Sequence, residues 1–300
     1  MIASSPTTIV IPTYNARALL TANLPSVEAI LRPGDELLIV EDGGTDNTVQ
    51  SLIERYQAVL QSSELSAQDE SYLLYEGSVN VGRGVVPVQV MLLNSNLRFA
   101  GAVNAAVQRV RTPLFFLLNN DVEPSVGILD VLTTFFEDSA TFGVGCLEYE
   151  SADKSVVGGK NTLFFSRGMF QHARATEFTT GETAWVSGGS GIFDTNKWKS
   201  LGGFDPKFYP AYWEDNDISF RARKRGWKTL FCAQAIVNHQ HETSNESVFG
   251  QAQIRKLSWQ HQNYFTRKHA SLSQLLQYLL WQPYWWWKMR TSGAKMILEN

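Results

Sequence analysis

Acidic and amide side chains follow three apolar runs of this sequence, Thr8–Asn15 (TIVIPTYN), Leu37–Asp46 (LLIVEDGGTD) and Leu114–Asp121 (LFFLLNND). Apolar runs of this length, rich in β-branched and aromatic residues, predict buried parallel strands. In an open α/β sheet, ligands bind outside the carboxyl ends of the strands. The sequence therefore predicts one sheet edge that offers groups to a polar ligand. Those groups are Asn15, Asp42, Asn119 and Asp121.

Asp121 is placed to bind a cation at that edge. Hard cations such as Mg²⁺ and Mn²⁺ prefer oxygen ligands, typically one or two carboxylates together with substrate phosphates. The alternative is a simple turn, because Asn and Asp favour turns through hydrogen bonds to their own backbone. The run Asn119-Asn120-Asp121 on its own favours neither interpretation.

Two adjacent acids, Glu41 and Asp42, end the second run. A carboxylate at a strand end accepts hydrogen bonds from a nucleobase or a ribose. The alternative is turn formation and helix capping. That alternative explains Asp46 better than it explains two acids at the end of a buried strand.

A predicted helix begins at Trp213–Asp217 with three acids in four positions, Glu214, Asp215 and Asp217. The helix dipole stabilises an acid in the first turn by about 0.3–1 kcal/mol, which explains one or two of them. Three acids this close repel one another, so capping alone explains the group poorly. A general base that removes the proton of a hydroxyl suits this place if the cleft is partly dry.

Two further features have two equally good interpretations each. His239 and His241 follow a predicted strand, and either contact a metal or phosphate or are structural; convergence of both on one metal is difficult, so we expect only one to bind. The run Trp281–Trp287 contains four tryptophans, with Lys288, Arg290 and Lys295 beside it. It either packs on the core or lies at a membrane interface, where Trp and basic residues are favoured, and a surface for a partner is a third alternative.

Composition limits the classes of protein. The chain has 300 residues, 44% of them hydrophobic, which is ample for a buried core. Its net charge of −3 gives no general attraction for nucleic acid, and we expect no nucleic-acid partner. Two cysteines without CxxC spacing make no disulfide framework, and the start of the chain lacks the pattern of a signal peptide. No apolar stretch approaches the roughly 20 residues of a membrane span, so a cytoplasmic location is expected.

Strands and helices are predicted to alternate through the first 120 residues and to become less regular afterwards. Residues 62–84 are predicted to be a surface excursion, because they are polar and weakly periodic. The strands are expected at 8–11, 37–41, 88–93, 114–118, 143–149, 183–187, 228–231 and 235–237. The helices are expected at 16–31, 49–56, 102–110, 126–136, 215–225 and from 251 onwards.

Seven runs, in this order, resemble the family 2 glycosyltransferases with a GT-A fold, from about Thr7 to Ala270. The stretch around Trp213–Arg221 is most similar to rhamnosyltransferase-like members. The runs are IVIPTYN (Ile9–Asn15), IVEDGGTDNT (Ile39–Thr48), NSNLRFAGAVNAAV (Asn94–Val107), FFLLNND (Phe115–Asp121), VSGGSGIF (Val186–Phe193), LGGFDPKFYPAYWEDNDISFRARKRGW (Leu201–Trp227) and VNHQHETS (Val237–Ser244).

The resemblance implies an α/β fold, a Rossmann-like, mostly parallel sheet flanked by helices with a helical C-terminal extension. We expect a catalytic domain over residues 1–245, with a nucleotide-sugar-binding half (1–121) and an acceptor half (122–245), followed by the extension (246–300). The resemblance implies an inverting transfer of a sugar from a nucleotide-diphosphate sugar to a saccharide or lipid-linked saccharide, assisted by Mn²⁺ or Mg²⁺. Peripheral contact with the inner face of the cell membrane through the tail is part of this expectation.

The resemblance also implies a role for each matching residue. Asp215 matches the general base, with Glu214 beside it, while Asp121 and His239 match positions at the metal. Arg98 lies in the loop that approaches the sugar donor. The donor-binding residues are Pro12, Tyr14, Asn15, Asp42, Arg98, Asn119 and Asn120, and the acceptor-binding residues are Gly188, Gly189 and Trp213.

The chain departs from the family pattern at several positions. Asn119 replaces the first Asp of the DxD motif, which removes one negative charge beside the metal. Arg98 stands where a glycine is common, and Glu41 where an Asp is usual. Two other functions stay open at this stage, a nucleotide-sugar-binding protein without transferase activity and a sugar nucleotidyltransferase. The second usually carries a Gly-rich basic loop near the first strand, where this chain has Pro12-Thr13-Tyr14-Asn15.

Overall fold

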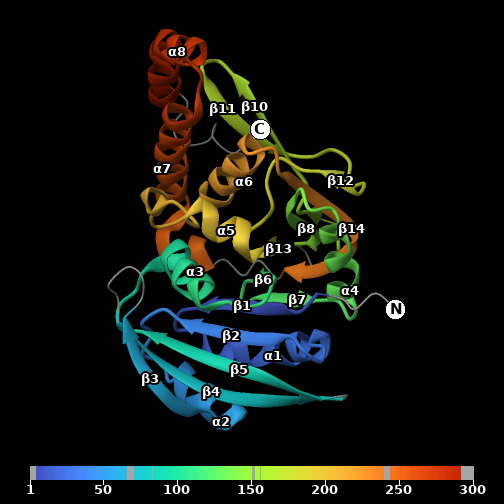
Figure 1. Cartoon of the computed structure of the whole chain (residues 1–300). Helices are drawn as coiled ribbons and strands as arrows, with labels where there is room; N and C mark the ends of the chain where they lie inside the picture. The colour runs from blue at the N-terminus through green and yellow to red at the C-terminus, as the bar shows by residue number, and fades with distance from the viewer. Residues whose placement is uncertain are drawn as a thin grey trace.

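The computed structural model describes residues 5–65, 71–82, 84–150, 153–155, 157–239 and 244–291. These residues form an α/β fold around one large mixed sheet, with a separate two-stranded ribbon and two long helices at the C-terminal end (Figure 1). The predicted α/β class is therefore confirmed. No helix among these residues has the length and apolar character needed to cross a bilayer.

Four parallel strands form the centre of the sheet, in the order β5-β2-β1-β6. Every residue of β1 and of β6 is buried, as expected of parallel strands covered on both faces. The first ten elements are β1 (Thr7–Thr13), α1 (Arg17–Ile30), β2 (Glu36–Glu41), α2 (Thr48–Tyr56), β3 (Val59–Leu65), β4 (Ser71–Val81), β5 (Gly84–Leu93), α3 (Arg98–Arg109), β6 (Leu114–Leu118) and β7 (Val122–Pro124).

The second half of the chain extends the sheet beyond β6. β13 is antiparallel to both β6 and β8, and β14 is parallel to β8, so β8 and β14 point in the same direction as β6. The remaining elements are α4 (Ile128–Thr133), η1 (Thr134–Glu137), β8 (Thr141–Tyr149), β9 (Val157–Gly158), β10 (Asn161–Ser166), β11 (Met169–Arg174), β12 (Gly181–Glu182), β13 (Ser190–Asp194), α5 (Thr195–Leu201), η2 (Pro206–Phe208), α6 (Glu214–Lys224), β14 (Lys228–His239), α7 (Ser244–His269) and α8 (Leu272–Thr291).

Helices cover both faces of the sheet and bury a core on each. Apolar residues of α1, α2 and α4 pack on one face, and those of α3, α5 and α6 pack on the other. The small residues of α3, such as Ala102 and Ala106, let this helix lie close to the strands. With both faces covered, the edges of the sheet are the places where strand ends can meet a ligand.

A third, smaller core holds the C-terminal helices to the rest of the chain. Phe265 of α7 packs with Phe170 of β11, with Phe208 of η2 and with Trp213, which precedes α6. α7 is interrupted at Gly250, where the backbone is not helical (φ 68°). The predicted domain boundary at residues 245 and 246 falls inside α7, and the division into domains stays a prediction.

Three local predictions are wrong. Residues 62–84 were expected to be a surface excursion, but the described ones, apart from Gly82, belong to β3, β4 and the start of β5, an antiparallel extension of the sheet. Tyr72 and Leu74 are buried, whereas Leu73 and Tyr75 are only partly buried, which is the alternation of a strand. Residues 183–187 form no strand, and β13 begins later, at Ser190. The two strands predicted at 228–231 and 235–237 form the single strand β14, whose pairing with β8 is irregular after Cys232.

Candidate active site

The carboxyl ends of β1, β2, β6, β8 and β14 meet at one edge of the sheet, as the sequence predicted for the first three. Asn15 joins the loops that follow β1 and β2. Its side-chain oxygen accepts hydrogen bonds from the backbone N–H of Thr45 (2.6 Å) and of Asp46 (3.2 Å). Its own backbone N–H donates to Glu41 Oε1 (3.0 Å). The position of Asn15 therefore depends on an acid that sequence analysis noted only as the neighbour of Asp42.

Asp42 holds the loop before α3 against the end of β2. Its Oδ1 accepts a hydrogen bond from the backbone N–H of Leu97 (2.7 Å). Gly43 allows this approach, because a Cβ there would lie 2.9 Å from the carbonyl carbon of Ser95, and its φ is 72°. Burial raises the pKa of Asp42 to about 6, although hydrogen bonds from the backbone N–H groups of Leu97 and Arg98 oppose the shift. Burial likewise raises the pKa of Glu41 to about 7.

Arg98 keeps the backbone conformation that a glycine would take at this position. Its φ is 60°, in the left-handed region, although it is not glycine. Its side chain reaches Tyr209, with Nε 3.4 Å from the hydroxyl oxygen, and its charge lies near Tyr14 and Asp42. The backbone at Arg98 therefore lies in the region that favours glycine. Tyr14 is 46% exposed beside it, whereas Pro12 is buried in β1.

Asp121 and His239 lie together where β7 pairs with the end of β14. Oδ1 of Asp121 is 3.3 Å from Nε2 of His239, and both side chains are largely buried. Burial lowers the pKa of His239, but the hydrogen bond and charge of Asp121 outweigh it, so the net shift is upward. His241, the second histidine of this stretch, lies outside the described residues. The resemblance placed both residues at the metal, and the structure brings their side chains together.

The two asparagines before Asp121 have different surroundings. The backbone N–H of Asn119 donates to the carbonyl of Gly189 (2.9 Å), and a Cβ on Gly189 would lie 2.7 Å from Asn119 Nδ2. Asn120 instead donates from Nδ2 to Thr13 Oγ1 (3.0 Å) and accepts from Asn23 Nδ2 at its carbonyl (2.7 Å). Asn120 therefore ties the strand end to β1 and α1, while Asn119 lies against the loop before β13.

Asp215 and Glu214 begin α6 beside the same loop. The backbone N–H of Gly188 lies 3.4 Å from Asp215 Oδ2, and that of Asn216 lies 3.1 Å from Oδ1. Glu214 is buried, and its Oε2 accepts no hydrogen bond from any described residue. Burial raises the pKa of both carboxyl groups, and the charge of Asp215 raises that of Glu214 further. Asp215 is partly buried, and part of the residue remains exposed to solvent. Partial exposure suits a group that exchanges protons.

Glu148 at the end of β8 is a member of this edge that sequence reasoning missed. It is buried, and its Oε1 accepts a short hydrogen bond from Ser190 Oγ at the start of β13. Its charge raises the pKa of both Asp215 and His239, so it lies near both groups of the site. The available signal was an acid at the end of the apolar run 143–149, the pattern that had drawn attention to Asp42 and Asp121.

Asp217 and Trp213 are buried, and their side chains contact other parts of the protein. Asp217 is fully buried and contacts Arg221 Nε, Lys268 Nζ and His269 Nε2, each at 2.7 Å. These contacts, with two cations and a histidine, explain the third acid of the helix start, for which capping was insufficient. The indole of Trp213 is 3% exposed and packs against Phe265. Its assignment to the acceptor stays a prediction.

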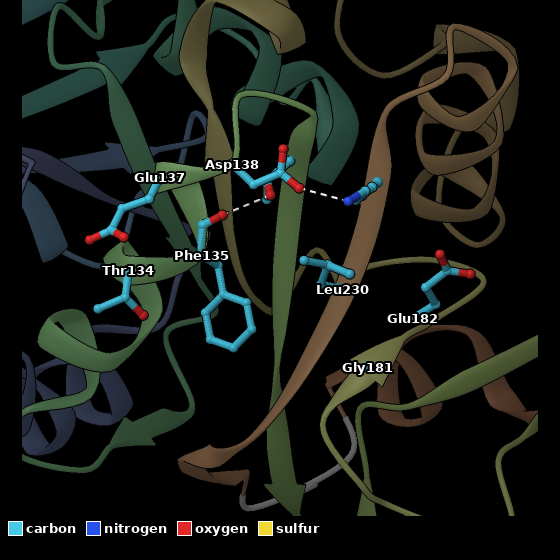
Figure 2. A pocket seen from close by; sticks show the side chains of 9 residues that line it. Thr134, Phe135, Glu137, Asp138, Gly181, Glu182 and Leu230 are labelled. Atoms are coloured by element: carbon cyan, nitrogen blue, oxygen red, sulfur yellow. Dashed lines mark hydrogen bonds and ion pairs between the residues drawn. The ribbon is translucent and has the colours of Figure 1, made fainter.

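An open hollow of about 640 Å³ lies at the other edge of the sheet (Figure 2). Lys228 and Thr141, the first residues of β14 and β8, line it, and an ion pair joins Lys228 Nζ to Asp138 Oδ2 (2.7 Å). Glu148 and His239 lie at the opposite ends of the same two strands. The hollow is therefore separate from the candidate site.

A mixed sheet covered on both faces, with acids at the carboxyl ends of its parallel strands, is the GT-A arrangement, and similar solved structures share it. One is GalNAc-T7 with UDP, GalNAc and Mn²⁺, with a TM-score of 0.59, 14% identity, and coverage of 80% of this chain and 45% of that one. Another is the mannosyltransferase PcManGT of Pyrobaculum calidifontis with GDP-Man and Mn²⁺, with a TM-score of 0.59, 13% identity, and coverage of 94% and 70%. At these identities the likeness concerns the fold.

Sequence comparison gives the family. The family model described as glycosyltransferase-like family 2 matches residues 79–261, more than half of the chain, and that of glycosyl transferase family 2 matches residues 8–72. The chain therefore belongs to the family 2 glycosyltransferases. It is 22% identical over 245 residues to the O-antigen chain rhamnosyltransferase RfbN of Salmonella typhimurium, covering 81% of this chain and 68% of that protein.

Proposed function

We propose that this glycosyltransferase inverts the configuration of the transferred sugar, with Asp215 as the general base. The main support is the position of Asp215, at the start of α6 beside Gly188 and at the edge that also carries Asp42 and Asp121. Asp215 removes the proton of the acceptor hydroxyl while that oxygen attacks the anomeric carbon. The bond from that carbon to the diphosphate breaks in the same step, which produces inversion.

Asp121 and His239 are the residues that we propose hold a divalent cation. Asp121 Oδ1 is buried, and no described residue donates a well-aligned hydrogen bond to it. Among the described residues no group of three His, Cys, Asp or Glu side chains is suited to a metal, so the remaining ligands would come from the diphosphate and water. Bound there, Mn²⁺ or Mg²⁺ would neutralise the charge that develops on the leaving diphosphate.

A saccharide or lipid-linked saccharide is the acceptor that we propose, at the cytoplasmic face of the cell membrane. The support is the similarity to a rhamnosyltransferase of O-antigen chains, together with the exposed apolar side chains of α8. We assign the donor half of the site to Pro12, Tyr14, Asn15, Asp42, Arg98, Asn119 and Asn120, and the acceptor contact to the backbone at Gly188 and Gly189.

Turnover of a nucleotide sugar is the direct test of this proposal. A panel of donors is screened for hydrolysis and for thermal shift, with and without Mn²⁺. We expect one donor to give both a Mn²⁺-dependent shift and hydrolysis. A thermal shift without turnover, whichever acceptor is offered, would instead favour a nucleotide-sugar-binding protein. This outcome is worth testing because Asn119 stands where the family has the first Asp of the DxD motif.

Substitution of Asp121 by Ala is expected to abolish Mn²⁺-dependent donor binding. Asp121 is the only carboxylate of its strand-end run, so no neighbour in that run replaces it. Calorimetry of the donor with and without Mn²⁺ measures the effect, and Asp138→Ala, at the opposite edge of the sheet, is the matched control. Unchanged Mn²⁺-dependent affinity in Asp121→Ala would place the metal elsewhere.

Donor affinity is expected to fall as the pH is lowered through 6. Asp42 must be ionised to accept hydrogen bonds from the base, and burial raises its pKa to about 6. The ionised fraction then falls about tenfold between pH 7 and pH 5, so the Kd should rise by about that factor. Titration of a nucleotide sugar at both pH values measures it. The variant Asp42→Asn should bind weakly and lack this pH dependence, and equal affinities of the unaltered protein at both pH values would contradict the role of Asp42.

A further inference from the structure

α8 presents an apolar stripe to solvent. Its members recur at intervals of three and four residues, so they share one face of the helix. Their exposed fractions include 84% for Leu272 and 57% for Trp287, values far from those of a core-facing helix. We call them the α8 stripe, which consists of Leu272, Leu276, Leu279, Leu280, Pro283, Trp286 and Trp287.

The opposite face of α8 is held by polar contacts, which fix the direction of the stripe. Trp285 is buried, and its Nε1 donates to the carbonyl of Arg167 (2.7 Å) in the β10–β11 turn. The guanidinium of Arg167 donates to the hydroxyl of Tyr284 (2.7 Å), and Tyr278 donates to Asn263 Oδ1 of α7 (3.0 Å). Rotation of the helix to bury the stripe would break these bonds. Figure 1 shows α8 at the end of the molecule, beside this ribbon and far from β3 and β4.

The charge of this part of the chain is one-sided. Between Ser247 and Leu298 there are seven basic residues and no acidic residue, although the whole chain has a net charge of −3. Lys288 follows Trp287 in sequence, and its Nζ lies 5.4 Å from the centre of the Trp285 ring, on the face opposite the stripe. One of the seven, Lys268, is paired with Asp205 and Asp217. An apolar helical face bearing Leu and Trp, in a segment with an excess of positive charge, complements a bilayer that contains anionic lipid.

We propose that the α8 stripe docks on the surface of an anionic lipid bilayer, with the helix lying in the plane of the interface. This inference rests on the proposed function, because it brings the active site to a lipid-linked acceptor. A second copy of the chain is the competing occupant of an exposed apolar helix. Pairing two copies through α8 would bring two positively charged segments together, which opposes that alternative.

Vesicle flotation of the full chain tests the proposal. We expect the protein to float with phosphatidylcholine vesicles that contain about a third phosphatidylglycerol, and to bind less to pure phosphatidylcholine or in about 0.5 M salt. The double variant Leu276→Ser/Leu280→Ser should lose at least about tenfold in partitioning.

The matched control is Val59→Ser/Leu60→Ser, which makes similar changes at exposed apolar residues of β3. It should float like the unaltered protein, and the melting temperatures of both double variants should match because the altered side chains are exposed. Equal flotation of the two double variants, or none by the unaltered protein, would overturn the proposal. A concentration-dependent dimer in light scattering that is lost in Leu276→Ser/Leu280→Ser would assign the stripe to a second copy.

Donor hydrolysis separates this inference from the proposed function. Both double variants should hydrolyse a soluble donor at the rate of the unaltered protein, because the stripe lies outside the candidate site. Vesicle binding without hydrolysis of any donor would support the docking surface and contradict the proposed function. Hydrolysis of a donor without vesicle binding would support the proposed function and contradict the docking surface.

Discussion

Asp215→Asn is expected to lower kcat by roughly 10²-fold or more and to leave the Kd of the donor almost unchanged. The amide keeps the size of the carboxylate and the hydrogen bond from Gly188 at Oδ, but it does not accept the proton of the acceptor hydroxyl. Burial raises the pKa of Asp215 above that of a free Asp, closer to the pH at which the base works. Steady-state kinetics and calorimetry of the donor measure the two quantities.

Glu214→Gln is the matched control for this prediction. Glu214 is adjacent in sequence and its pKa is also raised by burial, but it is more deeply buried than Asp215. We expect it to retain most of the kcat. Near-normal turnover in Asp215→Asn, or a larger loss in Glu214→Gln, would assign the base to another residue.

Asp217→Ala is expected to destabilise the protein by about 3–5 kcal/mol, because removing one partner of a buried ion pair leaves uncompensated charge. Its carboxylate is fully buried between Arg221 of α6 and Lys268 and His269 of α7. Burial raises the pKa of Asp217, but the hydrogen bond from His269 and the charges of Arg221 and Lys268 lower it more, so the net shift is downward. The stabilisation is therefore present above the pKa of an unfolded Asp and is lost as the pH falls through the lower, folded value.

Denaturant unfolding at pH 7 measures the effect of Asp217→Ala. Asp130→Ala is the matched control, since Asp130 is the exposed partner of Arg32 and a surface pair contributes about 0–1 kcal/mol. If Asp217→Ala unfolds at the same denaturant concentration as the control, the ion-pair network contributes no net stability. The packing of α7 on the rest of the protein would then depend on the apolar contacts of Phe265.

The sequence determined the central sheet and the residue types at its edge. Runs that end in Asn15, Asp42 and Asp121 are mostly apolar, which is the composition of a strand buried on both faces. Parallel strands place their carboxyl ends together, so the edge followed from the runs. The strands over 62–84 were missed because polar residues and glycines surround the short apolar run Tyr72–Tyr75, which left a weak strand signal.

Only the tertiary structure decided which of several residues of one type lies at the candidate site or the surface and which is buried. Asp215 and Asp217 are two residues apart in α6, yet one faces the candidate site and the other is enclosed by cations from α6 and α7. Trp285 is buried against the β10–β11 turn, while Trp286 and Trp287 point to solvent. Such differences depend on segments distant in the sequence. A local pattern specifies the face of a helix or strand, whereas the element that packs on that face is set by the whole fold.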